Sequence, residues 1–164
     1  MRHIISILME NESGALSRVS GLFSARGYNI ESLSVAPTDD PSLSRLTLVT
    51  TGTDEIVEQI TKQLNKLIDV VKLIDLTEGE HIEREMMLIK VSTRTREACD
   101  DVTRLADIFG ARVLDVSDKC YTIEVTDSVQ RLDDFIEALD KKQIVEVVRS
   151  GVIGIARGNK ALTL

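Results

Sequence analysis

The sequence predicts an α+β protein made of two domains that share one plan, strand–helix–strand–strand–helix–strand. Four segments carry apolar residues at helical spacing, and short runs rich in Ile, Val and Leu flank these segments as strands would. Gly27 and Gly110 close the first helical segment of each half at matching places. The second half therefore repeats the first, and each half has the order of a ferredoxin-like domain.

In the first half, residues 3–9 predict a buried strand because the run is short, Ile-rich and uninterrupted. Residues 28–36 predict an extended segment that ends at a turn around Pro37, and residues 44–51 alternate as a strand covered on one face does. Residues 70–76 predict the closing strand. The two helices are predicted from apolar stripes at Ala15, Leu16, Val19, Leu22 and Phe23, and at Ile56, Ile60, Leu64 and Leu67.

In the second half, strands are predicted over residues 86–91, 111–117, 119–126 and 144–148. The helices are predicted from stripes at Ala98, Val102, Leu105, Ala106 and Phe109, and at Val129, Leu132, Phe135, Ile136 and Leu139.

These elements divide the chain into a first domain over 1–76, a polar linker over 77–84 and a second domain over 85–164. A four-stranded sheet with both helices on one face leaves its other face uncovered. A homodimer is therefore expected.

The amino-acid composition argues against several classes of function. The chain has 164 residues, 43% of them hydrophobic, and a formal net charge of −7. This acidic balance argues against a nucleic-acid partner and against a polybasic membrane contact. The apolar run after His3 is too short for a signal peptide or a membrane span, so a cytoplasmic location is expected.

Candidate metal ligands are scattered. Cys99 and Cys120 form no paired motif, so free thiols are expected. His3 is placed at a strand edge and His81 in the solvated linker, and neither belongs to a metal-ligand pattern. No cofactor or metal is expected in this chain.

The loop after the first strand is the candidate site. Ser13 is predicted to cap the helix, and Gly14 removes side-chain bulk at its first turn. Free amides at the positive end of a helix dipole attract a carboxylate. Asn11 leaves two alternatives open, a turn asparagine bonded to its own backbone or a side-chain carbonyl that holds a ligand's ammonium group.

The blocks NESGALSR and GYNIESL closely resemble the start of the small, regulatory subunits of acetolactate synthase (acetohydroxyacid synthase). The resemblance implies that the first domain is an ACT domain that binds a branched-chain amino acid as a feedback inhibitor. It also implies a partner, the large catalytic subunit, which carries thiamine diphosphate, Mg²⁺ and FAD. By resemblance, this chain activates that subunit, makes it sensitive to valine and has no catalytic residues of its own.

The same resemblance implies the ligand contacts. Asn11, Gly14, Ala15, Leu16 and Ser17 would come from the loop and first helical turn of one copy. Asn29 and Ile30 would reach the same ligand across a dimer interface from the other copy, with Asn29 on its polar end and Ile30 on its aliphatic part. The choice among valine, leucine and isoleucine stays open, because an aliphatic pocket discriminates one methylene by only about 1–3 kcal/mol.

Two other function classes fit the predicted fold less well. An acylphosphatase-like hydrolase needs an arginine in the first loop, but that loop is acidic here and Arg18 falls inside the predicted helix. A free-standing amino-acid sensor acting on transcription lacks a helix-turn-helix pattern and has the wrong charge for DNA.

Overall fold

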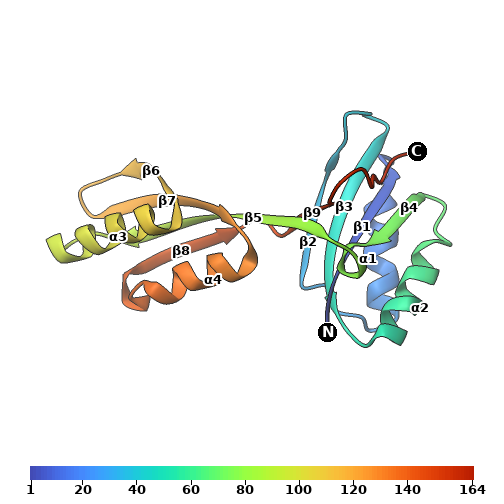
Figure 1. The fold of residues 1–164 in the computed structure, drawn as a ribbon, viewed down its shortest axis with the longest axis horizontal. Coiled ribbons are helices and arrows are strands. Elements are labelled where there is room, and N and C mark those ends of the chain that lie inside the picture. The colour runs from blue at the N-terminus through green and yellow to red at the C-terminus, as the bar shows by residue number, and fades with distance from the viewer. The chain divides into compact units, whose positions relative to one another are not determined.

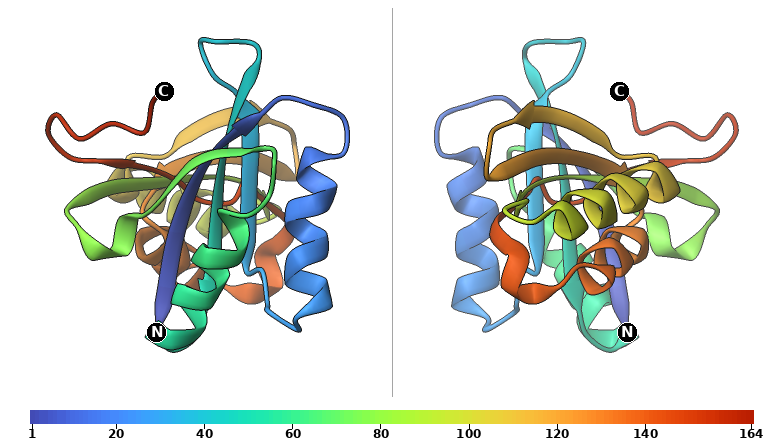
Figure 2. Two further views of the ribbon diagram at one scale, coloured as in Figure 1. Left: turned by 90° about the vertical axis from the view of Figure 1, so that its right-hand side faces the viewer. Right: turned by 90° about the vertical axis from the view of Figure 1, so that its left-hand side faces the viewer.

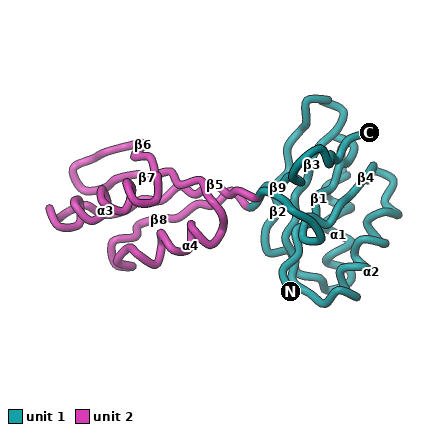
Figure 3. The backbone as a smooth tube through the Cα atoms, viewed as in Figure 1, with its two compact units in different colours: residues 1–82, 152–164 teal, residues 83–151 magenta.

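The structure is a computed structural model that describes all residues, 1–164. They form two compact units, one of residues 1–82 with 152–164 and one of residues 83–151 (Figure 3). Our sequence-based division placed 85–164 together. In the structure the segment 152–164 instead packs with the first unit, because it returns to the sheet of that unit.

The first unit contains a four-stranded antiparallel sheet with the order β2-β3-β1-β4. This is the βαββαβ arrangement that the sequence predicts. Its elements are β1 (Arg2–Glu10), α1 (Ala15–Ala25), β2 (Ser32–Pro37), β3 (Leu43–Thr51), α2 (Asp54–Leu64) and β4 (Val70–Asp75). The second strand begins at Ser32, later than the predicted extended segment.

The core of this unit lies between the sheet and its two helices (Figure 1). Side chains alternate along a strand, so Ile5, Ile7 and Met9 of β1 point to the same face, where they meet Val19 of α1 and Ile60 of α2. All five are at most 2% exposed. Burying each such side chain contributes roughly 1.5–3 kcal/mol, which explains why both helices lie against one face of the sheet.

The opposite face of this sheet is partly covered by the C-terminal segment. Strand β9 (Ile153–Ala156) lies there, and Arg45 Nη2 donates a hydrogen bond to the carbonyl oxygen of Gly154 at 3.3 Å. A Cβ added to Gly154 would lie 2.7 Å from Leu76 Cδ1 and 3.8 Å from Ile4 Cγ2. The face that we expected to be open is therefore packed in part by the chain's own end.

The second unit repeats the plan in its own antiparallel sheet, with the order β6-β7-β5-β8. Phe109 and Phe135 stack edge to face in its core, with ring centroids 5.2 Å apart. The elements are β5 (His81–Ser92), α3 (Arg96–Phe109), β6 (Arg112–Val116), β7 (Cys120–Asp127), α4 (Val129–Ala138) and β8 (Ile144–Arg149). The helices of both units can be followed in Figure 2.

The polar segment that we expected to be a linker over 77–84 has regular structure. A short 3₁₀ helix, η1 (Leu76–Glu78), leads into β5, which begins at His81. Exposed positions alternate along β5 from Ile82 to Lys90, as in a strand with one face covered, although Glu85 of this polar stretch is buried. A second 3₁₀ helix, η2 (Lys141–Gln143), precedes β8.

Candidate functional site

The loop between β1 and α1 ends at Gly14, which is the N-cap residue of the helix. Gly14 has φ 84° and ψ −6°, a left-handed conformation that glycine adopts without strain. No side chain caps this helix, so our prediction that Ser13 is the N-cap is wrong. The cap position lies one residue later, and its left-handed backbone conformation favours glycine over residues with a Cβ.

Because no side chain caps α1, backbone N–H groups at the start of this helix lack an acceptor. The first N–H groups of a helix have no acceptor within the helix. The amide of Ala15 donates to the carbonyl oxygen of Glu12 at 3.2 Å, which leaves the amides of Leu16 and Ser17 for an external acceptor. A carboxylate suits this place, because it accepts hydrogen bonds and its charge opposes the helix dipole.

Arg18 and Asp69 form an ion pair behind the loop. Arg18 Nε lies 2.5 Å from Asp69 Oδ2, and Arg18 Nη2 lies 3.1 Å from Asp69 Oδ1. The Asp69 side chain is 6% exposed. The hydrogen bond from Arg18 lowers the pKa of Asp69 and raises the pKa of Arg18, so both groups stay charged over a wide pH range.

This ion pair places the Arg18 guanidinium beside the glycine of the loop. A Cβ on Gly14 would lie 3.0 Å from Arg18 Nη1. Arg18 Nη2 also lies 3.5 Å from the carbonyl oxygen of Ser13. The guanidinium, paired with Asp69, therefore stands beside Gly14, and the absence of a side chain at Gly14 keeps that space free.

Asn11 ties the loop to the turn between β2 and β3. Its side-chain Nδ2 donates to the carbonyl oxygen of Pro41 at 3.0 Å, and its backbone N–H donates to the carbonyl oxygen of Ser42 at 2.8 Å. The side chain thus bonds a distant segment and not its own neighbours. Its carbonyl oxygen keeps the capacity to accept a hydrogen bond from an ammonium group.

The three residues after Gly14 have different surroundings. Ala15 is 2% exposed and belongs to the core of the first unit, whereas Leu16 is 39% exposed. Ser17 is exposed, and its carbonyl oxygen accepts a hydrogen bond from the Ser20 hydroxyl at 3.2 Å. Leu16 is thus the apolar side chain of this turn that faces away from the core.

Asn29 and Ile30 lie at the other end of α1. The carbonyl oxygen of Asn29 accepts a hydrogen bond from the Thr50 hydroxyl at 2.6 Å, and Ile30 packs against the core of the first unit. The 11-residue helix that separates them from the loop spans about 16 Å at 1.5 Å per residue. One copy of the chain therefore does not bring the two groups together.

Sequence reasoning missed the ion pair of Arg18 and Asp69 behind the candidate site. A signal was present, because Asp69 interrupts the apolar run LIDVV, and a lone acid in such a run is rarely buried without a partner. The identity of that partner depends on tertiary structure, since Arg18 and Asp69 are 51 residues apart in the chain.

The chain has no group of three or more His, Cys, Asp or Glu side chains placed to hold a metal ion. None of its helices is long and apolar enough to cross a membrane.

Comparison with known proteins decides the family. Residues 5–72 match the model of an AHAS small subunit-like ACT domain, and residues 84–158 match the model of the small subunit of acetolactate synthase. The acetolactate synthase isozyme 3 small subunit of Escherichia coli (strain K12) is 52% identical over 163 residues, which cover 99% of each chain. This chain belongs to the acetolactate synthase small-subunit family.

Other small subunits agree with this assignment. The acetolactate synthase small subunit of Haemophilus influenzae is 53% identical over 161 residues, which cover 98% of each chain. The crystal structure of the acetolactate synthase small subunit from Thermotoga maritima superposes with a TM-score of 0.88 at 38% identity, and the match covers 98% of this chain and 99% of that one. The regulatory small subunit described here therefore has an N-terminal ACT domain.

Proposed function

We propose that this small subunit binds and activates the large, catalytic subunit of acetolactate synthase and makes it sensitive to feedback inhibition by valine. The observation that carries the ligand site is the uncapped first turn of α1 with Arg18 beside Gly14. Membership of the family supports the partner. Valine, leucine and isoleucine are all candidates for the effector, and valine is the one to test first.

The loop suits both charged groups of an amino acid. The carboxylate would accept hydrogen bonds from the amides of Leu16 and Ser17, and the charge of Arg18 would favour it. The ammonium group would donate to the side-chain oxygen of Asn11. The small residues Gly14 and Ala15 would leave room for the ligand to approach the backbone of the loop. The exposed Leu16 side chain would contact the aliphatic part of the ligand.

A second copy of the chain would complete the pocket. Asn29 and Ile30 lie too far from the loop within one copy, so a pocket that uses both groups requires a homodimer. Strand β2 supports this arrangement, because it is an edge strand of its sheet and begins at Ser32, two residues after Ile30. A ligand held between two copies would stabilise one arrangement of the interface and so shift a conformational population.

The chemistry of the reaction would belong to the partner. Thiamine diphosphate, Mg²⁺ and FAD would be bound by the catalytic subunit, and this chain would supply no catalytic residue. Both subunits would act in the cytoplasm, on the pathway to branched-chain amino acids. The small subunit would then act only through its contacts with the catalytic subunit and with the amino acid.

Reconstitution tests this proposal. Acetolactate formation by the catalytic subunit of the same organism is measured with and without this chain, across a valine titration. The expected result is activation by the chain that valine reverses. Activation without valine sensitivity would retain the partner and redirect the search to leucine and isoleucine. No change in rate at any subunit ratio would contradict the proposed function.

A further inference from the structure

His3 is a buried histidine whose ring has a fixed orientation. It is 5% exposed, although its place near the start of the chain predicted a strand edge. His3 Nδ1 lies 2.9 Å from Asp75 Oδ2. Because an ionised carboxylate only accepts hydrogen bonds, Nδ1 carries a hydrogen and donates it. Asp75 is itself held, since its other oxygen accepts from the Thr77 amide at 2.9 Å.

The other ring nitrogen of His3 is buried without a partner. His3 Nε2 makes no hydrogen bond. The nearest charged atom is Oδ1 of Asp54, the first residue of α2, at 3.5 Å. In the neutral ring Nε2 is an acceptor, and so is the carboxylate. His3 Nε2 and Asp54 Oδ1 would then be two neighbouring acceptors with no donor between them. This is unusual, because buried polar atoms almost always have a hydrogen-bond partner.

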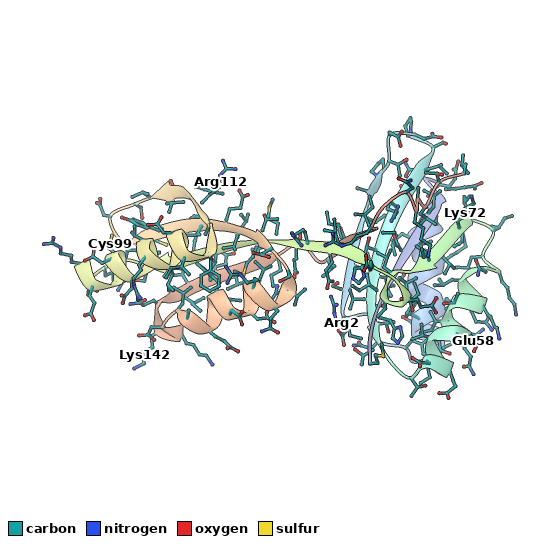
Figure 4. The ribbon with its side chains drawn as sticks, in the orientation of Figure 1. Arg2, Glu58, Lys72, Cys99, Arg112 and Lys142 are labelled. Carbon is teal, nitrogen blue, oxygen red and sulfur yellow. The ribbon has the colours of Figure 1, made fainter.

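His3 and Asp54 both line the same groove of the first unit. The groove has a volume of about 720 Å³ and runs between α2, β4 and η1. Its walls carry the acids Asp54, Glu58, Asp75 and Glu78. Lys62 is bound to Glu58 at 2.6 Å, so it neutralises one of them (Glu58 is labelled in Figure 4). The other charged residues of the lining are Asp54, Asp75, Glu78 and Met1, whose α-ammonium donates to the carbonyl oxygen of Gly52 at 3.2 Å. Carboxylates thus remain in excess, and Val57 and Leu73 form an apolar wall.

We propose that this groove binds an aliphatic primary ammonium group. The ammonium would donate one hydrogen to His3 Nε2 and another to the Asp54 carboxylate, and its carbon chain would lie along Val57 and Leu73. An ammonium offers three donors and a positive charge, which are what this pair of acceptors lacks. The excess of carboxylates disfavours ligands that carry a carboxylate, so this ligand class differs from the amino acids proposed for the Gly14 loop.

A divalent metal ion fits the groove less well. Imidazole nitrogen and carboxylate oxygen are common metal ligands, but a stable site needs three or four of them. The chain has no such group of three. An ammonium needs no fixed coordination geometry, and two acceptors at 3.5 Å are enough to orient it.

The competing explanation is a second proton on His3. An imidazolium would donate to Asp75 from Nδ1 and to Asp54 from Nε2, and the groove would then have no need of a ligand. The two explanations differ in the protonation of Nε2, which ¹⁵N NMR of the ring reports directly. They also differ in whether an amine perturbs that nitrogen in a saturable way.

The test is a titration of the full-length, ¹⁵N-labelled chain at pH 7.5 with n-butylamine, 1,4-diaminobutane and Nα-acetyl-lysine amide, with n-butanol and butyrate as controls. The expected result is a neutral His3 ring with bare Nε2, whose resonance shifts to saturation with the amines and not with the controls. A stronger effect of the lysine derivative would indicate a lysine side chain of a partner protein. A stronger effect of the diamine would indicate a free amine. Either preference supports the site.

Asp54→Asn provides the matched variant. Its side chain is 85% exposed, so the change leaves the fold intact. Loss of its charge is expected to weaken amine binding about five- to tenfold. Glu55→Gln, on the same exposed turn but outside the groove, is expected to bind as the parent does. Three results would each overturn the proposal: a doubly protonated His3 ring, no saturable shift with any amine, or unchanged binding by Asp54→Asn.

Discussion

Arg18 holds the nearly buried carboxylate of Asp69 through two hydrogen bonds while it lies against Gly14. The pair joins α1 to the residue that precedes β4, because Asp69 stands directly before that strand. The backbone strengthens the same junction, since the Glu10 amide donates to the carbonyl oxygen of Asp69 at 2.8 Å. The loop that would hold an amino acid is thus fixed from behind by a charge pair.

The first prediction concerns the acid dependence of stability. The folded-state pKa of Asp69 is lowered by its hydrogen bond from Arg18, so this pair stabilises the fold fully above the unfolded-state pKa of about 4. The contribution is lost as the pH falls through the lower, folded-state pKa. Arg18→Met is therefore expected to lower the free energy of unfolding at pH 7 and to differ less from the parent at pH 3. Urea unfolding at both pH values measures this.

Arg104→Met is the control for that experiment. Arg104 and Asp101 form an exposed pair on α3 with 3.3 Å between Nη2 and Oδ1, and such pairs contribute about 0–1 kcal/mol. Its loss is expected to change stability little at either pH. A loss for Arg18→Met that is the same at pH 3 and pH 7 would show that the charge pair is not its origin.

The second prediction concerns Gly14. Gly14→Asp places a side chain on a left-handed backbone, which costs roughly 1–2 kcal/mol for a residue with a Cβ. It also pushes on Arg18 and adds a negative charge where the carboxylate would bind. We expect valine inhibition to be lost while activation of the catalytic subunit is largely retained. Rate measurements across a valine titration test both effects.

Gly21→Ala is the matched glycine variant. Gly21 lies in α1, its backbone is not left-handed, and a Cβ there would meet nothing within 4 Å. We expect this variant to keep the parent's valine response and to be more stable by about 0.4–1 kcal/mol. Wild-type valine inhibition in Gly14→Asp would place the ligand elsewhere.

The third prediction concerns Asn11. Asn11→Ala removes the bond to the Pro41 carbonyl oxygen and the proposed bond to the ligand's ammonium group. We expect ligand affinity to fall by roughly 1–3 kcal/mol, equivalent to one or two hydrogen bonds. Isothermal titration calorimetry with valine measures the change directly. Asn65→Ala, at the exposed C-terminal end of α2, serves as the control and should bind as the parent does.

The fourth prediction concerns the packing of the C-terminal segment on the first unit. Gly154→Ala would bring a Cβ to 2.7 Å from Leu76 Cδ1, a residue that is 2% exposed. Overpacking of this kind costs typically about 1–3 kcal/mol. We expect thermal unfolding at a lower temperature and faster proteolysis after β8. Gly79→Ala, which meets nothing within 4 Å, should differ from the parent by less than about 0.5 kcal/mol.

The sequence predicted most of the fold because its periodicities are local. The run at 3–9 and the stripe through Val19 and Phe23 follow from residues within a few positions of one another. Helix ends were harder to predict from the sequence where a capping residue was involved. Ser13 has the right chemistry for an N-cap, but the chain turns at Gly14 because only glycine accepts that backbone angle easily.

The sequence points to part of the proposed site. Asn11 and Gly14 stand out in the sequence because a polar loop with a glycine precedes an amphipathic helix. Arg18 looked like an ordinary helix residue, and His3 like a strand edge. Their partners Asp69 and Asp75 come from distant parts of the chain, so no local pattern could pair them.

The sequence by itself determined the two repeated domains, the acidic balance and the glycine loop, because composition and spacing are properties of neighbouring residues. Only the tertiary structure decided that Arg18 is fixed by Asp69, that His3 Nε2 is buried without a partner, and that the segment 152–164 packs on the first sheet. Burial and ion pairing depend on which distant segments share one side of a sheet. That arrangement is set by packing of the whole core and not by any short stretch of the chain.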